Sequence, residues 1–370
     1  MLTGTKLRAF RKSLLAWFRQ FQRDLPWRRD RDAYRVWLSE IMLQQTRVAA
    51  VIPYYERFLE HFPTVSALAE APTEEVLRFW SGLGYYSRAR NLQRAAQQIV
   101  AKHAGEFPED QENALALPGI GAYTAAAILS IAFDQGHAVL DGNVARVLAR
   151  LFAIRGDLRE PARWQRLQRS ADELLERKAP GDWNQAMMEL GATICTPRAP
   201  QCLLCPVAKH CAARKQGIQE EIPEKRKKRT PVSVTLAAAV FVNPQGDTVL
   251  LPPPRTGSEK VGADHVPTLV SKMWHFPTIA VTGDPRTELE RHLKSECALD
   301  KKRSSSGMLS LVALGRVRHS VTYRQITICA FRIPVAKLPL LDGAKAVALN
   351  ELASVPISNL TRKIGRAALA

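Results

Sequence analysis

The sequence LPGIGAYTA, Leu117–Ala125, decides the fold of the N-terminal half of the chain. A helical segment precedes it and a strongly apolar helical segment follows it. Two glycines, Gly119 and Gly121, permit a tight turn with positive φ angles. The backbone N–H groups of such a turn lie at the start of the next helix, where the helix dipole favours an anion. The stretch predicts either a helix–hairpin–helix clamp for a phosphate or an ordinary corner between two helices.

The charge of the whole chain favours the phosphate clamp. Its 370 residues include 53 Lys and Arg against 35 Asp and Glu, a net charge of +18, which favours phosphate-rich partners. Hydrophobic residues make up 46% and charged residues 24%, a balance typical of a globular protein and not of a disordered one. The sequence has no run of 18 apolar residues, so no transmembrane helix is expected. The N-terminus lacks a signal-peptide core.

The composition and the hydrophobic spacing of the sequence change after Cys211. Residues 1–216 carry apolar side chains at helical spacing, with breaks at Pro and Gly. Residues 217–231 are polar and strongly basic, which is typical of a linker. In residues 232–370, stretches such as Val232–Val242 and Ser310–Leu314 have the composition of strands. We therefore predict a mainly α N-terminal domain, a basic linker and an α+β C-terminal domain.

Four cysteines lie within 17 residues, as Cys195-x6-Cys202-x2-Cys205-x5-Cys211. This crowding indicates a metal centre before a disulfide. Zinc sites tend to use two short Cys-x-x-Cys pairs, whereas this sequence has one short pair with longer gaps on both sides. An iron–sulfur cluster also takes four cysteines, so the spacing leaves both metals open and favours iron–sulfur modestly.

Two carboxylates stand alone in apolar or amide-rich surroundings. Glu40 lies next to Ile41 and close to Trp37, so burial would raise its pKa and suit it to donate a proton. Asp141 precedes Gly142, and a second carboxylate that stays ionised can stabilise an oxocarbenium-like centre. The ordinary alternatives are a surface salt bridge for Glu40 and a helix N-cap for Asp141.

With these segments in order, the chain closely resembles the MutY-type adenine DNA glycosylases, a family of helix–hairpin–helix glycosylases related to endonuclease III. The motifs that carry the resemblance are Leu25-Pro26-Trp27-Arg28, Ser39–Thr46, Gly82–Tyr86, Leu117–Ala125, Leu140–Val147, Asn184–Gly191 and the four cysteines. The family fold has two mainly helical subdomains with a DNA cleft between them. In the family this cysteine spacing binds a [4Fe–4S] cluster, so the resemblance favours that cofactor over zinc.

The resemblance implies that the chain removes adenine mispaired with 8-oxoguanine or guanine in double-stranded DNA. Glu40 matches the general acid that protonates adenine N7, and Asp141 matches the carboxylate that stabilises the positive sugar. Asn143 would orient Asp141, and Tyr123 would lie near the reaction centre. The endonuclease III branch has a lysine at the Tyr123 position, and its amine gives a Schiff base and strand cleavage. Tyrosine cannot form one, so we predict a glycosylase with little or no lyase activity.

The resemblance also implies two sets of substrate contacts. Arg28 and Gln185 match positions that line the adenine pocket. The positions that approach the orphan 8-oxoguanine are matched by Gln45, Thr46, Leu83 and Tyr85. Core packing for Leu83 and a simple loop role for Gln45 are the ordinary alternatives.

The C-terminal domain resembles the family's Nudix-like lesion-recognition domain. Met273–Pro277 matches its usual Trp-x-Phe-Pro segment, and residues 285–299 lack the metal-binding Nudix run, so pyrophosphatase activity is not expected. Many members carry Phe-Ser-His where this chain has Val321-Thr322-Tyr323. Thr322 keeps a hydroxyl group at the serine position, while Tyr323 replaces the histidine. This departure leaves the strength of discrimination against guanine open. We expect a monomer in the bacterial cytoplasm, associated with the nucleoid, without membrane contact and not secreted.

Overall fold

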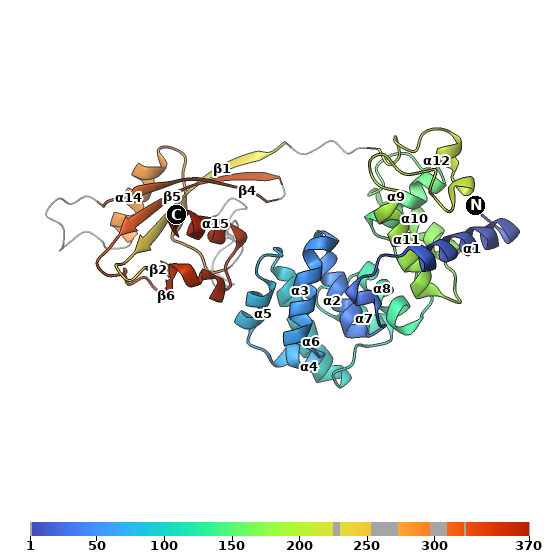
Figure 1. The fold of residues 1–370 in the computed structure, drawn as a ribbon, viewed down its shortest axis with the longest axis horizontal. Coiled ribbons are helices and arrows are strands. Elements are labelled where there is room, and N and C mark those ends of the chain that lie inside the picture. The colour runs from blue at the N-terminus through green and yellow to red at the C-terminus, as the bar shows by residue number, and fades with distance from the viewer. Residues whose placement is uncertain (1, 225–229, 253–272, 297–308, 322, 370) are drawn as a thin grey trace. The chain divides into compact units, whose positions relative to one another are not determined.

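The computed structural model describes residues 2–224, 230–252, 273–296, 309–321 and 323–369. Contacts divide the chain into two units, Met1–Glu70 with Arg90–Lys227 and Ala71–Ala89 with Lys228–Ala370 (Figure 1). None of the described helices is long and apolar enough to span a membrane.

The described residues of the first unit form helices and no strands, which confirms the predicted all-α region. Its helices are α1 (Gly4–Phe21), η1 (Pro26–Arg28), α2 (Ala33–Leu43), α3 (Val48–His61), α4 (Val65–Glu70), α6 (Ser87–His103), which begins within the second unit, α7 (Gln111–Ala116), α8 (Ala122–Phe133), α9 (Gly142–Leu151), α10 (Pro161–Leu174), α11 (Pro180–Thr193), η2 (Ala208–His210) and α12 (Ala212–Lys215).

Helix α8 forms the centre of the first unit because its sequence is apolar on every side. Residues 124–131 are all buried, and the helix packs against α2, α7 and α11. The turn before it requires glycine at Gly119, whose φ is +82°, and an added Cβ there would lie 2.9 Å from the Cβ of Asn91. The prediction of positive φ was wrong for Gly121, which is extended at φ −102° and is the N-cap of α8. Open space surrounds its Cα, so the approach to the helix N-terminus is clear.

The second unit is built around a mixed sheet, which confirms the predicted α+β class. Its elements are α5 (Thr73–Trp80), β1 (Val232–Val242), β2 (Asp247–Leu250), β3 (Thr278–Ala280), α14 (Pro285–Glu296), β4 (Val312–Val321), β5 (Arg324–Pro334), β6 (Lys345–Ala348), η3 (Leu349–Ser354) and α15 (Asn359–Leu369). The main sheet has the order β3-β1-β5-β4, in which only β1 and β5 are parallel, and β2 pairs with β6 in a smaller sheet.

Both faces of strand β1 are buried from Leu236 to Val242, which explains the continuous apolar sequence there. Leu236, Ala238 and Val240 pack in the core that includes Leu360 and Ile364 of α15. The alternate residues, Ala237, Ala239 and Phe241, pack in the core that includes Leu289 and Leu293 of α14. The sheet is therefore covered by one of these helices on each face.

The turn after α5 is bonded to the C-terminal residues of the second unit. The hydroxyl groups of Ser81 and Tyr86 both lie 3.1 Å from the carbonyl oxygen of Ile357 and donate to it. In the opposite direction, two C-terminal side chains donate to the turn. Asn359 Nδ2 donates to the Gly82 carbonyl at 3.1 Å, and Arg362 Nη2 donates to Ser81 Oγ at 2.7 Å. These bonds explain why residues 71–89 group with a region that is far from them in sequence.

Candidate active site

One cavity of about 490 Å³ in the helical unit brings together most of the residues that were predicted to act in catalysis or to contact the substrate. This volume suits a small organic group such as a nucleobase. The predicted residues that line it are Arg28, Glu40, Gln45, Thr46, Tyr123, Asp141, Asn143 and Gln185.

Glu40 lies on α2 with only 8% of its surface exposed. The phenol O–H of Tyr123 donates to Glu40 Oε2 at 2.8 Å. Burial raises the pKa of Glu40 from its ordinary 4.5 to about 7, and the charge of Asp141 acts in the same direction. The Tyr123 hydrogen bond and the charge of Arg28 oppose the rise. Glu40 therefore holds a proton that it can release near neutral pH.

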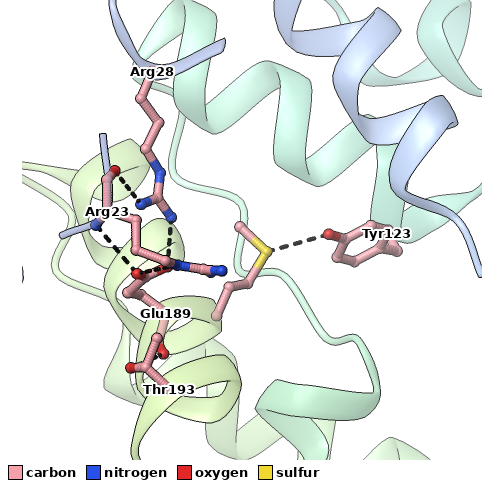
Figure 2. Close-up of polar contacts among 6 residues, drawn as sticks. Arg23, Arg28, Tyr123, Glu189 and Thr193 are labelled. Carbon is pink, nitrogen blue, oxygen red and sulfur yellow. Dashed lines mark hydrogen bonds and ion pairs between the residues drawn. The ribbon is translucent and has the colours of Figure 1, made fainter. Parts of the chain in front are cut away.

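Tyr123, on the first turn of α8, lies between Glu40 and α11. Its hydroxyl oxygen is 3.2 Å from the sulfur of Met188, the contact that is dashed in Figure 2. Burial and the charges of Glu40 and Asp141 hold the pKa of Tyr123 well above its ordinary value, so the phenol stays neutral. A neutral phenol can donate a hydrogen bond, but it is a poor nucleophile.

Asp141 is the N-cap of α9, which is the structural role that the sequence offered for it as an alternative. Its Oδ1 accepts from the backbone N–H of Val144 at 2.7 Å, and its Oδ2 accepts from Asn143 Nδ2 at 3.0 Å. Burial raises the pKa of Asp141, while these hydrogen bonds and the charge of Arg146 oppose the rise. The cap geometry aims the carboxylate into the same cavity as Glu40, so the structural and the chemical roles are compatible.

A chain of hydrogen bonds holds Asn143 in its position beside Asp141. Arg146 Nη2 donates to Asn143 Oδ1 at 2.9 Å and to the Gly191 carbonyl at 2.8 Å. Helix α11 lies so close to Asn143 that a Cβ added to Gly191 would be 2.8 Å from the Cβ of Asn143. Only glycine therefore fits at this position of α11. Arg146 Nε also donates to the Cys195 carbonyl at 2.8 Å, which connects α9 to the cysteine segment.

Sequence reasoning missed two charged residues of the cavity wall, Arg23 and Glu189. Glu189 lies on α11, 1% exposed, and accepts hydrogen bonds from both Arg23 and Arg28 (Figure 2). The signal that identified Glu40, a lone carboxylate in an apolar helix, was also present at Glu189 within Ala186–Leu190. Arg23 precedes the first motif and carried no comparable signal.

The four cysteines line one cavity, together with Arg150, and no carboxylate or imidazole lines it. Four thiols without oxygen or nitrogen ligands suit a soft metal centre. No group of three or more His, Cys, Asp or Glu in the described residues is close enough to hold a single metal ion. Arg150 Nη1 lies 3.3 Å from Cys195 Sγ, and its buried Nη2 has no partner within the described part of the chain. An anionic thiolate cluster would give this guanidinium group a counterion, so the residues fit a [4Fe–4S] group.

Two further residues that were predicted to contact the substrate, Leu83 and Tyr85, do not line the helical unit's cavity. Leu83 is buried, as its packing alternative predicted, whereas Tyr85 is 46% exposed with a positive φ of +50°. Both belong to the turn bonded to Ile357 in the second unit. Thr322 lies outside the described residues.

The chain is similar to several known proteins. A model of the HhH-GPD superfamily of base excision DNA repair proteins matches residues 38–173. The adenine DNA glycosylase of Homo sapiens is 36% identical over 97% of this chain and 73% of its own length. A solved thermostable thymine-DNA glycosylase is 29% identical, with a TM-score of 0.52, over 57% of this chain and 97% of that chain. An endonuclease III trapped as a covalent intermediate with DNA shares the fold, at 24% identity and a TM-score of 0.50, over 59% of this chain and 100% of that chain.

Proposed function

The chain belongs to the adenine DNA glycosylase family, and from this premise we propose that it excises adenine paired with 8-oxoguanine or guanine by a monofunctional reaction. It is a base-excision-repair enzyme that hydrolyses an N-glycosyl bond of DNA. The observation that carries the proposal is the meeting of Glu40, Tyr123 and Asp141 in one cavity.

Adenine must leave the duplex before these residues can reach it, at a cost of roughly a few kcal/mol. In our proposal, Glu40 then donates its proton to adenine N7, so that the bonding electrons leave with a neutral base. Tyr123 donates to one oxygen of Glu40, which leaves the other oxygen to carry this proton.

Asp141 supports the second half of the proposed reaction. As the C1′–N9 bond breaks, positive charge develops on the sugar, and a fixed carboxylate nearby stabilises it. Asn143 is the positioning residue, because its amide donates to Asp141 and is itself held by Arg146. A water molecule completes the hydrolysis by adding to C1′. The reaction needs no amine nucleophile, and Tyr123 supplies none.

We expect adenine release from duplexes with adenine opposite 8-oxoguanine or guanine, and strand breaks only after alkali. A single-turnover assay would compare these duplexes with adenine opposite cytosine or thymine, each analysed with and without alkali. Breaks without alkali, or activity on oxidised pyrimidines alone, would favour the endonuclease III type of reaction. Equal rates opposite 8-oxoguanine and guanine would show that the Val321-Thr322-Tyr323 sequence recognises the lesion weakly.

We further propose that Cys195, Cys202, Cys205 and Cys211 hold the [4Fe–4S] cluster that is general in this family. When bound, the group supplies structural order to the segment that follows α11, by replacing four thiol protons with metal–sulfur bonds. Without metal the Cys205 thiol stays protonated, since burial raises its pKa to about 12.

Replacing Cys202 by serine is therefore expected to lower bound iron well below that of the wild-type protein and to lower the melting temperature. Colorimetric iron analysis and thermal melting measure the two effects. Cys329→Ser is the matched control, because that half-buried thiol lies on β5 of the other unit. Undiminished iron in Cys202→Ser would contradict the assignment.

A further inference from the structure

The Arg23, Arg28 and Glu189 side chains form a charged cluster in the wall of the adenine cavity, which we call the arginine–glutamate cluster. Arg23 donates twice to the carboxylate, through Nε at 2.7 Å and Nη2 at 2.8 Å, and its backbone N–H adds a third bond at 3.3 Å. Arg28 Nη2 donates to Glu189 Oε2 at 2.9 Å. One buried carboxylate is thus shared by two cations (Figure 2).

Arg28 is fixed by more than its ion pair. Its Nη1 donates to the Arg23 carbonyl at 3.1 Å, and its guanidinium carbon lies 5.4 Å from the centre of the Phe18 ring. The two hydrogen bonds use two of the five guanidinium donors. A side chain held at one edge in this way keeps a single orientation toward the cavity that it lines.

Arg28 is the member of the cluster that acts on Glu40, which lines the same cavity. The groups that influence the Glu40 carboxyl are Tyr123, Asp141 and Arg28, and the positive charge of Arg28 lowers the pKa of Glu40. Glu189 is ionised: although burial opposes its charge, the hydrogen bonds and charges of Arg23 and Arg28 lower its pKa below the ordinary value. An ionised Glu189 beside Arg28 offsets part of the cation's field at Glu40.

We propose that Glu189 is a positioning residue for adenine excision, which fixes Arg28 at the wall of the cavity and serves as its counterion opposite Glu40. This inference rests on the proposed role of Glu40 as the general acid. Without the counterion, the full charge of Arg28 would favour the ionised form of Glu40, which has no proton to donate.

The test is the pH dependence of single-turnover adenine excision by the full-length Glu189→Gln variant. Because the general acid must be protonated, the rate falls as pH rises through the pKa of Glu40, which gives the profile a basic limb. In Glu189→Gln this limb should move to lower pH by roughly one unit, since the charge of Arg28 is no longer offset. The variant should therefore lose more activity at pH 8 than at pH 6.

Two further variants make the result specific. Asp182→Asn is the matched control, because Asp182 is also on α11 and also accepts from two arginines, Arg19 and Arg31, but does not line the cavity. The basic limb of the pH profile of Asp182→Asn should stay in the wild-type position. In the Arg28→Gln background, adding Glu189→Gln should move the limb less than it does in the wild-type background, because only the charge of Arg23 then remains to be offset. If the single variant fails to fold, this shift is compared with the expected shift of roughly one unit instead.

A uniform loss of rate at every pH, with an unmoved limb in folded Glu189→Gln, would reduce Glu189 to a merely structural role. A limb shift in the Arg28→Gln background as large as in the wild-type background would also overturn the inference. Failure of the proposed function would give a different result: Glu40→Gln, assayed in parallel, would then keep its activity.

Discussion

Glu40→Gln is expected to lower the single-turnover rate of adenine excision by roughly 10²- to 10⁴-fold, the usual contribution of a general acid. The glutamine amide keeps the shape of the side chain and an oxygen that accepts from Tyr123, but it carries no acidic proton. For the wild-type protein, the rate should fall as pH rises through about 7, the pKa that burial gives to Glu40. Single-turnover rates between pH 5 and 9 measure both effects.

The stability of the same variant provides the control. The pKa of Glu40 is higher in the folded state, about 7 against an ordinary 4.5, so the folded protein binds this proton more tightly. The contribution of Glu40 to stability is therefore lost as pH rises through that interval. Glu40→Gln removes this loss, and its melting temperature should exceed that of the wild-type protein at pH 8. A variant that melts normally and still excises adenine within a few-fold of the wild-type rate would exclude Glu40 as the acid.

Asp141→Asn is expected to reduce the rate by roughly 10²- to 10³-fold, because the stabilising charge beside the sugar is lost. Asparagine caps a helix about as well as aspartate, so α9 should keep its N-terminus and the protein its melting temperature. The variant thus separates the chemical role of Asp141 from its structural role. Single-turnover assays and thermal melting measure the two.

Asp110→Asn is the matched control for this prediction. Asp110 caps α7 with the same pattern, accepting from the backbone N–H and the side-chain amide of Asn113 at 2.8 Å each, but it does not line the cavity. Its substitution should leave the rate unchanged. If Asp141→Asn lost activity only in proportion to a lowered melting temperature, the carboxylate would be a cap alone.

The sequence predicted those parts of the site whose chemistry is visible in a single segment. Glu40 and Asp141 are carboxylates isolated among apolar or amide side chains, and the structure has them in one cavity. Glu189 was not predicted, although it is the most buried of the three and is, like Glu40, a lone carboxylate in an apolar helix. Its role depends on Arg23, which is 166 residues away in the chain, and a pairing over that distance leaves no local pattern that links the two residues.

The fold was predicted well where periodicity is continuous and less well at irregular points. The strand predicted over Val232–Val242 has these limits in the structure, since its apolar run has no interruption. The strand predicted over Ser310–Leu314 extends instead over Val312–Val321. Gly315, with φ +92°, lies at a register shift between β4 and β5, and the strand continues past this bulge.

The bonds between the Ser81–Tyr86 turn and the C-terminal residues have a consequence for protein engineering. The second unit is assembled from two pieces of sequence, 71–89 and 228–370, so the linker is not a simple recombination boundary. A chimaera that exchanges only residues 228–370 would replace the Ile357 carbonyl, Asn359 and Arg362, which are the hydrogen-bond partners of this turn. A transplant that keeps the turn's own hydrogen bonds must carry both pieces together.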